Sequence, residues 1–257
     1  MSQRLLLYSV FHKPAPMPQA PYVVPIQVGA AGAQMGLGML TDATGDHISG
    51  LNPYWSELTA LYWIWKNADR SAADAWGLCH YRRYFSLPQK KLLFLPRSRS
   101  YYALNQRSLD AVVTTELYSW LQGRLQTHDV VVQQPTWAHK KGGKTYSIAA
   151  AYALQHNQRD WDRTMDLIRQ LFPEYDASIK AFEQENRLSY YNMMVARWPV
   201  WDGYLEWLFR ILFALRDELG DTAAPRLYGY LSERLMNLYL RHNGLRAAYS
   251  TIALLER

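Results

Sequence analysis

The stretch GLCHYRRYF, residues 77–85, joins an apolar run to a cluster of positive charge. With the two residues before it, the run 75–85 predicts one strand of a sheet. Because side chains alternate along a strand, we expect His80 and Arg82 on one face and Arg83 on the other. The charged residues stand at the carboxyl end of this strand, where open α/β sheets bind their ligands. This segment therefore indicates both the fold class and the position of a candidate site.

The chemistry of this cluster favours an anionic ligand. A planar guanidinium binds phosphate oxygens with two parallel hydrogen bonds and keeps its charge at neutral pH. The alternative is structural: one arginine pairs with a core carboxylate, and His80 is a neutral imidazole with its hydrogen bonds satisfied. Both interpretations stay open on the sequence.

Strands and helices alternate on both sides of this segment. Apolar runs with strand character and stretches with helical spacing follow one another along the chain. We predict strands over 4–11, 22–30, 75–85, 129–135 and 188–196, and helices over 52–69, 107–128, 146–172, 200–220 and 227–244. Such alternation is typical of an α/β fold, here a single domain over residues 1–257 with a mixed central sheet flanked by helices.

The composition limits the class of protein. The chain has 257 residues, 49% of them hydrophobic, so it can bury a core of its own. Lys and Arg number 28 against 22 Asp and Glu, a mild excess that suits anionic partners. Acidic residues interspersed throughout disfavour a nucleic-acid surface, and no apolar run is long enough to span a bilayer. The single cysteine, Cys79, excludes an internal disulfide and indicates a reducing cytoplasm.

Five blocks of the sequence carry a family resemblance. They are VPIQVGA (24–30), LTDATGDHISGLNPYWSELTALYWIWKN (40–67), GLCHYRRYF (77–85), YYNMMVA (190–196) and GYLSERLMNLYL (229–240). These blocks resemble the bacterial domain-of-unknown-function 4422 family, described as glycosyltransferases of capsular polysaccharide, exopolysaccharide and lipopolysaccharide biosynthesis. The resemblance covers nearly the whole chain.

The resemblance implies a GT-A-type, Rossmann-like glycosyltransferase. Such an enzyme moves a hexose from a nucleotide-sugar donor, here UDP-linked, to a surface glycan or its lipid-linked precursor. Galactose, as pyranose or furanose, is the sugar that the family suggests. The single cysteine favours a cytoplasmic protein. Core packing is the favoured interpretation of the apolar stretch 204–215, and an exposed part of it would suit docking at the cytoplasmic face of the inner membrane. We expect residues 1–135 to bind the donor and residues 136–257 to bind the acceptor.

One motif departs from the pattern of the fold family. Many GT-A enzymes end the central strand with Asp-x-Asp, which binds a divalent cation, whereas this chain has His-Tyr-Arg at 80–82. We therefore expect no cofactor and do not favour manganese or magnesium. Arg82 or Arg83, with Lys144 of the basic stretch 139–146, would stabilise the leaving diphosphate directly. The alternative for the basic stretch is an exposed, solvated loop.

Carboxylates supply the candidate catalytic groups. Glu233 is the expected base, because an inverting transferase needs a carboxylate or histidine that accepts the proton of the acceptor hydroxyl. Asp42 and Asp46 could accept hydrogen bonds from sugar hydroxyls or bind a cation with His47; we place Asp42 with the donor and Asp46 with the catalytic groups. Turn formation is the alternative for both aspartates, a surface ion pair is the alternative for Glu233, and Glu57 is expected to interact with a helix dipole.

Polar residues at other predicted strands complete the expected site. His12 and Gln27 follow the first two strands and suit the base and ribose of the donor. Tyr191 and Asn192 suit the acceptor, because a tyrosine ring stacks on a sugar and an amide binds hydroxyl groups. The alternative function is a non-catalytic glycan-binding or scaffold protein of a polysaccharide biosynthesis complex.

Overall fold

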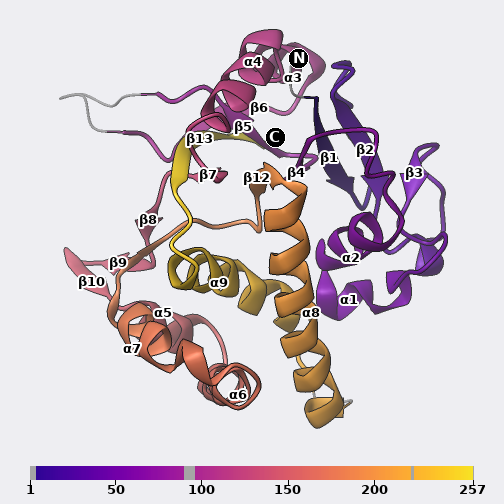
Figure 1. The fold of residues 1–257 in the computed structure, drawn as a ribbon. Coiled ribbons are helices and arrows are strands. Elements are labelled where there is room, and N and C mark those ends of the chain that lie inside the picture. The colour runs from indigo at the N-terminus through magenta and orange to yellow at the C-terminus, as the bar shows by residue number, and fades with distance from the viewer. Residues whose placement is uncertain (1–3, 90–95, 221–222, 257) are drawn as a thin grey trace.

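The computed structural model describes residues 4–89, 96–220 and 223–256. Within these residues a mixed sheet of nine strands forms the centre of the molecule (Figure 1). The strands of this sheet are β1 (Leu5–Phe11), β2 (Val23–Gln27), β3 (Leu40–Thr41), β4 (Ala75–His80), β5 (Arg83–Ser86), β6 (Arg99–Ala103), β7 (Val130–Gln133), β12 (Met194–Arg197) and β13 (Ala247–Glu256). Two antiparallel pairs stand outside it: β8 (Thr136–Trp137) with β11 (Arg187–Leu188), and β9 (His139–Lys141) with β10 (Lys144–Tyr146).

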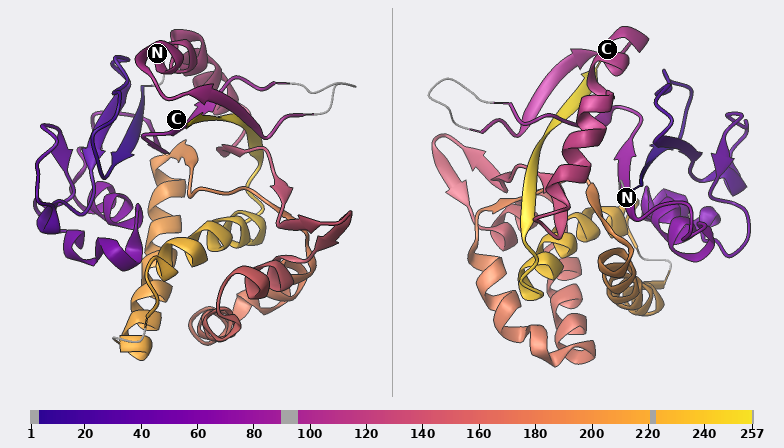
Figure 2. Two further views of the ribbon diagram at one scale, coloured as in Figure 1. Left: turned by 180° about the vertical axis from the view of Figure 1, so that it is seen from behind. Right: turned by 45° about the horizontal axis from the view of Figure 1, so that its top comes forward.

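Helices cover both faces of the sheet. The α-helices are α1 (Asn52–Trp55), α2 (Leu58–Asn67), α3 (Gln106–Val112), α4 (Thr115–Arg124), α5 (Ile148–Gln155), α6 (Gln158–Leu171), α7 (Asp176–Gln184), α8 (Trp198–Leu219) and α9 (Leu227–His242). Short 3-10 turns are η1 (Ala30–Gly32), η2 (Ser49–Leu51) and η4 (Pro173–Tyr175). Figure 2 shows α8 and α9 between the N-terminal part with α1 and α2 and the group α5 to α7. None of the helices in the described ranges has the length and apolar character that a bilayer crossing requires.

The strand pairing brings distant parts of the chain together. β1 pairs in parallel with β2 and β4, and β12 runs antiparallel between β4 and β7. β13 runs parallel to β6 and β7 and antiparallel to β5. A mixed sheet flanked by helices confirms that part of the predicted fold class.

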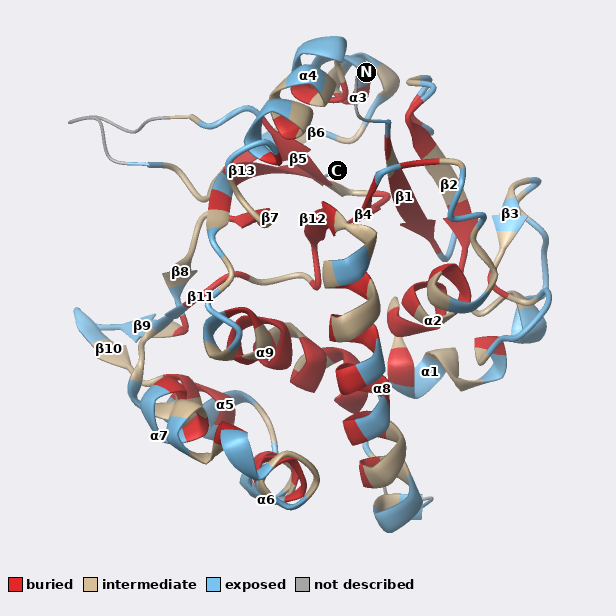
Figure 3. Ribbon diagram, viewed as in Figure 1, coloured by how far each residue is buried: buried red, intermediate tan, exposed pale blue. Residues whose placement is uncertain are grey.

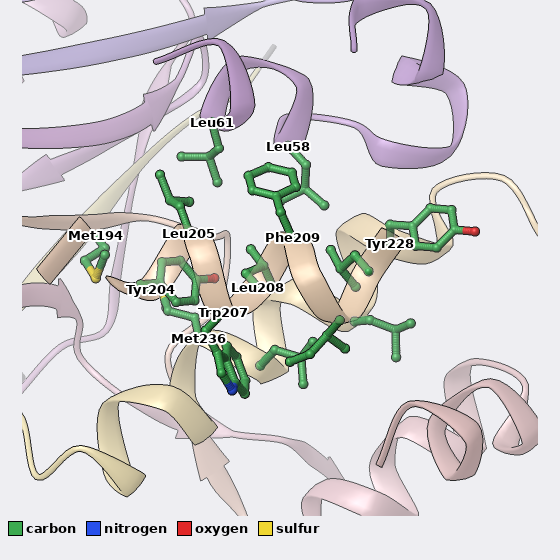
Figure 4. Packing of buried hydrophobic residues seen from close by; sticks show 14 of the residues in the cluster. Leu58, Leu61, Met194, Tyr204, Leu205, Trp207, Leu208, Phe209, Tyr228 and Met236 are labelled. Carbon is green, nitrogen blue, oxygen red and sulfur yellow. The ribbon is translucent and has the colours of Figure 1, made fainter. Parts of the chain in front are cut away.

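Side-chain alternation divides the buried residues into two cores. Along β7, Val130 and Val132 enter the larger cluster with α8 and α9, whereas Val131 enters the smaller cluster with α3 and α4. Figure 3 shows buried residues on the sheet and on most of α9. In the larger cluster, Leu208 and Phe209 of α8 pack among residues of α2 and α9 (Figure 4). Both faces of the central sheet are therefore covered.

The predicted strand over 75–85 is wrong in one respect that matters for the site. β4 ends at His80, the turn is Tyr81 and Arg82, and β5 begins at Arg83, which pairs with His80. Side-chain alternation along one strand therefore does not relate His80, Arg82 and Arg83, because Arg82 lies in a turn. The turn escaped prediction because neither of its residues is the glycine or asparagine that favours two-residue hairpins.

Other predicted elements are interrupted or missing. The helices expected over 52–69, 107–128 and 146–172 each divide into two, the last at Asn157, whose side chain caps α6. The strand expected over 188–196 is β11 and β12, separated by residues 189–193. The strands β6 and β13 and the helix α7 have no counterpart in the prediction.

Gly77 is required at the centre of β4. A Cβ there would lie 2.4 Å from Leu7 Cδ2 and 2.9 Å from Val195 Cγ2, atoms of the two neighbouring strands. We expect Gly77→Ala to lower the free energy of unfolding by about 1–3 kcal/mol, measured by chemical denaturation. Gly123→Ala is the matched control, because no atom beyond its chain neighbours and the backbone of its own helix lies within 4 Å of its Cβ position in α4. A Gly77→Ala variant as stable as wild type would contradict this packing.

Candidate active site

The His80 side chain joins the β4–β5 hairpin to a distant segment. Its Nε2 lies 2.7 Å from the Tyr191 carbonyl oxygen. Since a carbonyl oxygen can only accept, Nε2 carries the proton and donates it. Burial, and next the charge of Arg83, lower the pKa of His80 to about 3. His80 is therefore a neutral imidazole that holds the backbone at Tyr191, which corresponds to the structural alternative for this residue.

The segment between β11 and β12 has an unusual backbone. Tyr191 and Asn192 have φ angles of 77° and 52°, in the left-handed region. The Tyr191 amide donates to Glu233 Oε1 at 3.2 Å. The Asn192 side-chain amide donates to Glu57 Oε1 at 2.7 Å and to the Gly229 carbonyl at 3.3 Å. This turn thus connects the hairpin, α9 and the residue before α2.

Two carboxylates, Glu57 and Glu233, face this turn. Burial raises the pKa of both groups, and the charge of Glu57 raises the pKa of Glu233 further. Arg83 favours the ionised form of each, and Arg234 Nη1 donates to Glu233 Oε2 at 2.9 Å. The Glu233 side chain remains 18% exposed. A carboxylate with a raised pKa and partial access to solvent is suited to accept a proton.

Backbone strain is concentrated around these carboxylates. In the described parts of the chain, the non-glycine residues with positive φ are Ser56, Tyr191, Asn192 and Arg226. Ser56 stands one residue before the first carboxylate, and Arg226 caps the amino end of α9. Such strain persists only where the surrounding contacts impose it, and it is typical of functional sites.

Basic side chains gather around the Tyr81 ring at the hairpin. The Tyr81 ring has the His12 ring at 5.1 Å, Arg82 at 5.1 Å and Lys13 at 5.9 Å. Burial, followed by the charges of Lys13, Arg82 and Arg226, lowers the pKa of His12. These groups lie at the carboxyl ends of β1 and β4, the edge predicted for ligand binding.

A cavity of about 220 Å³ opens beside the hairpin. Its lining consists of Arg82, Arg83, Arg99, Tyr101, Tyr191, Leu254, Leu255 and Glu256. Arg83 and Arg99 lie 4.7 and 5.4 Å from the centre of the Tyr191 ring. Among the described residues, no carboxylate comes within ion-pair distance of these two arginines or of Arg82.

Two residues expected at the donor instead hold a loop. Asp42 is fully buried and accepts hydrogen bonds from the backbone amides of 29–30 and from the Ser49 hydroxyl. Gln27, also buried, bonds to two backbone groups within 35–37. Because these contacts occupy both side chains, we no longer include Asp42 or Gln27 in the candidate site.

Two further predicted residues lie apart from the cluster. The Asp46 carboxylate accepts from the Tyr62 hydroxyl at 3.0 Å, and its backbone carbonyl accepts from Asn67. Asn67 ends α2, and a helix of this length separates its two ends by about 15 Å. Lys144 is exposed on β10, where its Nζ lies 5.2 Å from the centre of the Tyr146 ring. The structure therefore brings neither Asp46 nor Lys144 into the cluster formed by Glu57, Glu233, Tyr191 and the arginines near the hairpin.

The residues at the hairpin do not fit the divalent cation that the GT-A pattern implies. His80 Nε2 donates to Tyr191, and Arg82 places a positive charge where that pattern has a carboxylate. Within 4–89, 96–220 and 223–256, no group of three or more His, Cys, Asp or Glu side chains is placed to hold a metal. We assign no step to a metal.

Three residues of the cluster were not predicted to bind or react: Glu57, Arg99 and Arg226. The sequence assigns Glu57 to a helix dipole, because nothing local shows that Asn192 reaches it. Arg99 and Arg226 lie in segments without a predicted element. The repeated Arg-Ser at 97–100 was the one local signal, and it does not identify a partner.

The comparisons with known proteins agree with this architecture. The model of a family described as a domain of unknown function, DUF4422, matches residues 6–244. No curated protein matches the chain. The solved apo structure of the bifunctional glycosyltransferase WbbM is similar, with 25% sequence identity and a TM-score of 0.83 over 98% of this chain. The match covers 45% of the WbbM chain, so this chain spans less than half of that protein.

The low pKa of His80 predicts a pH-dependent loss of stability. As pH falls below about 6.5, unfolded His80 gains a proton that folded His80, with a pKa of about 3, does not bind. The folded state should lose about 2 kcal/mol from this residue by pH 5. We expect His80→Gln to reduce the fall in unfolding free energy between pH 7.5 and pH 5 by about this amount, measured by chemical denaturation.

The control for this measurement is Gln126→Asn, at an exposed position without a titratable side chain, which should leave the pH dependence as in wild type. Equal pH dependence in wild type and His80→Gln would contradict a neutral His80 in the folded state.

Proposed function

Because this chain belongs to the family of domain of unknown function DUF4422, and its fold is similar to that of a bifunctional glycosyltransferase, we propose that it transfers a sugar from a nucleotide-sugar donor to a glycan. One observation carries the proposal: the His80–Tyr191 hydrogen bond joins two partly buried carboxylates to arginines without carboxylate partners. Glycosyl transfer needs both a base for the attacking hydroxyl and positive charge for the leaving diphosphate.

The donor is proposed to bind at the carboxyl ends of β1 and β4. Arg82 there would bind the diphosphate, with His12 beside it and Arg83 on the side of the carboxylates. The guanidinium groups stabilise the negative charge that develops as the glycosidic bond breaks. In a GT-A-type domain this edge of the sheet holds the nucleotide, and a UDP-hexose, with galactose as the first candidate, is the proposed donor.

Glu233 is proposed as the base. Glu233 has a raised pKa and is partly exposed, so it is suited to accept a proton. The hydrogen bond from the Tyr191 amide holds its side chain near the arginines. In an inverting transfer the acceptor hydroxyl attacks the anomeric carbon, its proton passes to Glu233, and the bond to the diphosphate breaks. Glu57 fixes the turn from the other side through Asn192.

The acceptor is proposed to lie against Tyr191, whose ring faces the cavity beside Arg83 and Arg99. Asn192 is 2% exposed and its amide is bound to Glu57, so it positions the turn and we no longer assign it a contact with the acceptor. A glycan or lipid-linked glycan of a bacterial surface polysaccharide is the proposed acceptor class. A place at the cytoplasmic face of the inner membrane remains part of this proposal.

The donor contact predicts how UDP binds. We expect wild type to bind UDP with the same affinity in the presence and absence of EDTA. Arg82→Ala should weaken binding about 10- to 100-fold, because it removes charge-assisted hydrogen bonds to phosphate. Isothermal titration calorimetry measures both effects, with Arg107→Ala, an exposed arginine of α3, as the control. Binding that requires manganese and is unchanged in Arg82→Ala would refute the arginine contact.

The base predicts a separate kinetic effect. Glu233→Gln should lower kcat about 10²- to 10⁴-fold while UDP affinity stays near that of wild type. Since burial raises the pKa of Glu233, wild-type activity should be lost on acidification at a higher pH than an ordinary glutamate would give. UDP release from UDP-galactose with a lipid-linked glycan measures the rate, and Glu206→Gln, on the exposed face of α8, is the control. A Glu233→Gln enzyme with the wild-type rate would exclude this base.

A further inference from the structure

The cavity beside the hairpin has the chemistry of an anion site. Arg82 and Arg83 of the hairpin and Arg99 of β6 line it from two elements. The Arg99 Nε is buried and has no hydrogen-bond partner among the described residues. The guanidinium groups of Arg82, Arg83 and Arg99 have no carboxylate within ion-pair distance among the described residues, so their charge is available to an anionic ligand. The carboxylate in the lining, Glu256, belongs to an exposed residue.

An aromatic ring stands at the same cavity. Tyr101 lines it and is 65% exposed, the highest value among the exposed large hydrophobic side chains of the described chain. Such a ring can stack on the apolar face of a sugar. The cavity thus combines three guanidinium groups with a ring suited to a sugar, a pairing that fits a glycosyl phosphate.

Tyr191 places this cavity next to the proposed base. Its ring lies beside Arg83 and Arg99, and its backbone amide donates to Glu233. The base contacts the attacking hydroxyl of the acceptor, whereas the donor diphosphate is proposed to lie with His12 and Lys13 around the Tyr81 ring. An anion held beside Tyr191 therefore belongs to the molecule that Glu233 deprotonates.

We propose that the Arg83–Arg99–Tyr101 cavity binds a phosphate group of the acceptor, so that the acceptor is a phosphate-linked sugar whose reacting hydroxyl lies close to its phosphate. The inference rests on the proposed glycosyl transfer and adds the substrate class. It gives the protein two anion sites, one around the Tyr81 ring for the donor and one at Arg83 and Arg99 for the acceptor, with Arg82 beside both.

Two anion sites can be separated by competition. Inorganic pyrophosphate is titrated calorimetrically into the full chain already saturated with UDP. We expect pyrophosphate to bind in the presence of UDP, and Arg99→Gln to weaken that binding about tenfold or more while leaving UDP affinity unchanged. Arg82→Ala should weaken UDP binding more than pyrophosphate binding. Arg107→Gln is the control for loss of a surface charge.

A second variant distinguishes weaker pyrophosphate binding from a folding defect. Arg99→Lys keeps the charge but loses the planar fork, so it should fold as wild type by thermal melting and bind pyrophosphate with intermediate affinity. Displacement of pyrophosphate by UDP, or equal loss of both ligands in Arg99→Gln, would overturn the proposal by showing a single anion site. If wild type binds no UDP, the proposal for the donor site fails separately. Pyrophosphate binding that is weakened in Arg99→Gln would still support the cavity as an anion site. Pyrophosphate binding that is unchanged in Arg99→Gln would refute the cavity as an anion site.

Discussion

The hydrogen bond from His80 to the Tyr191 carbonyl holds the site together. It joins the end of β4 to the segment between β11 and β12, residues separated by 111 positions in the chain. Because the same segment bonds to Glu57 and Glu233, the hairpin, α2 and α9 are positioned by one strained turn. A neutral imidazole suits this role, since a charged one would stand beside Arg83 in a buried place.

Two partly buried carboxyl groups, Glu57 and Glu233, lie near arginines of the described hairpin that form no ion pair with them. Burial disfavours the ionised forms of Glu57 and Glu233, while the charge of Arg83 favours them. Arg82, Arg83 and Arg99 have no carboxylate partner in the described ranges, and their charge remains for a ligand. A proton acceptor and unpaired positive charge in one place are what the proposed glycosyl transfer requires, and here both depend on the fold of Tyr191 and Asn192.

The sequence predicts the layered architecture because hydrophobic periodicity is a local property. The apolar runs of β1, β2 and β7 and the amphipathic pattern of α8 and α9 are each visible in a short window. The turn at Tyr81 and Arg82 could not be predicted, since neither residue is typical of a hairpin turn and β5, which follows it, pairs with β13 near the far end of the chain. The same limit applies to the site: Glu233 and Arg82 stand in recognisable motifs, whereas the role of Glu57 depends on a contact with Asn192, 135 positions away.

We propose that arginines at the hairpin, and no metal, bind the diphosphate of a sugar nucleotide. A crystal structure of the protein with UDP and manganese would show which groups contact the diphosphate. We expect the diphosphate between Arg82 and His12, at the carboxyl ends of β1 and β4, with no manganese bound to it. A manganese ion bridging the diphosphate to protein carboxylates, or UDP bound away from the hairpin, would refute the arginine site.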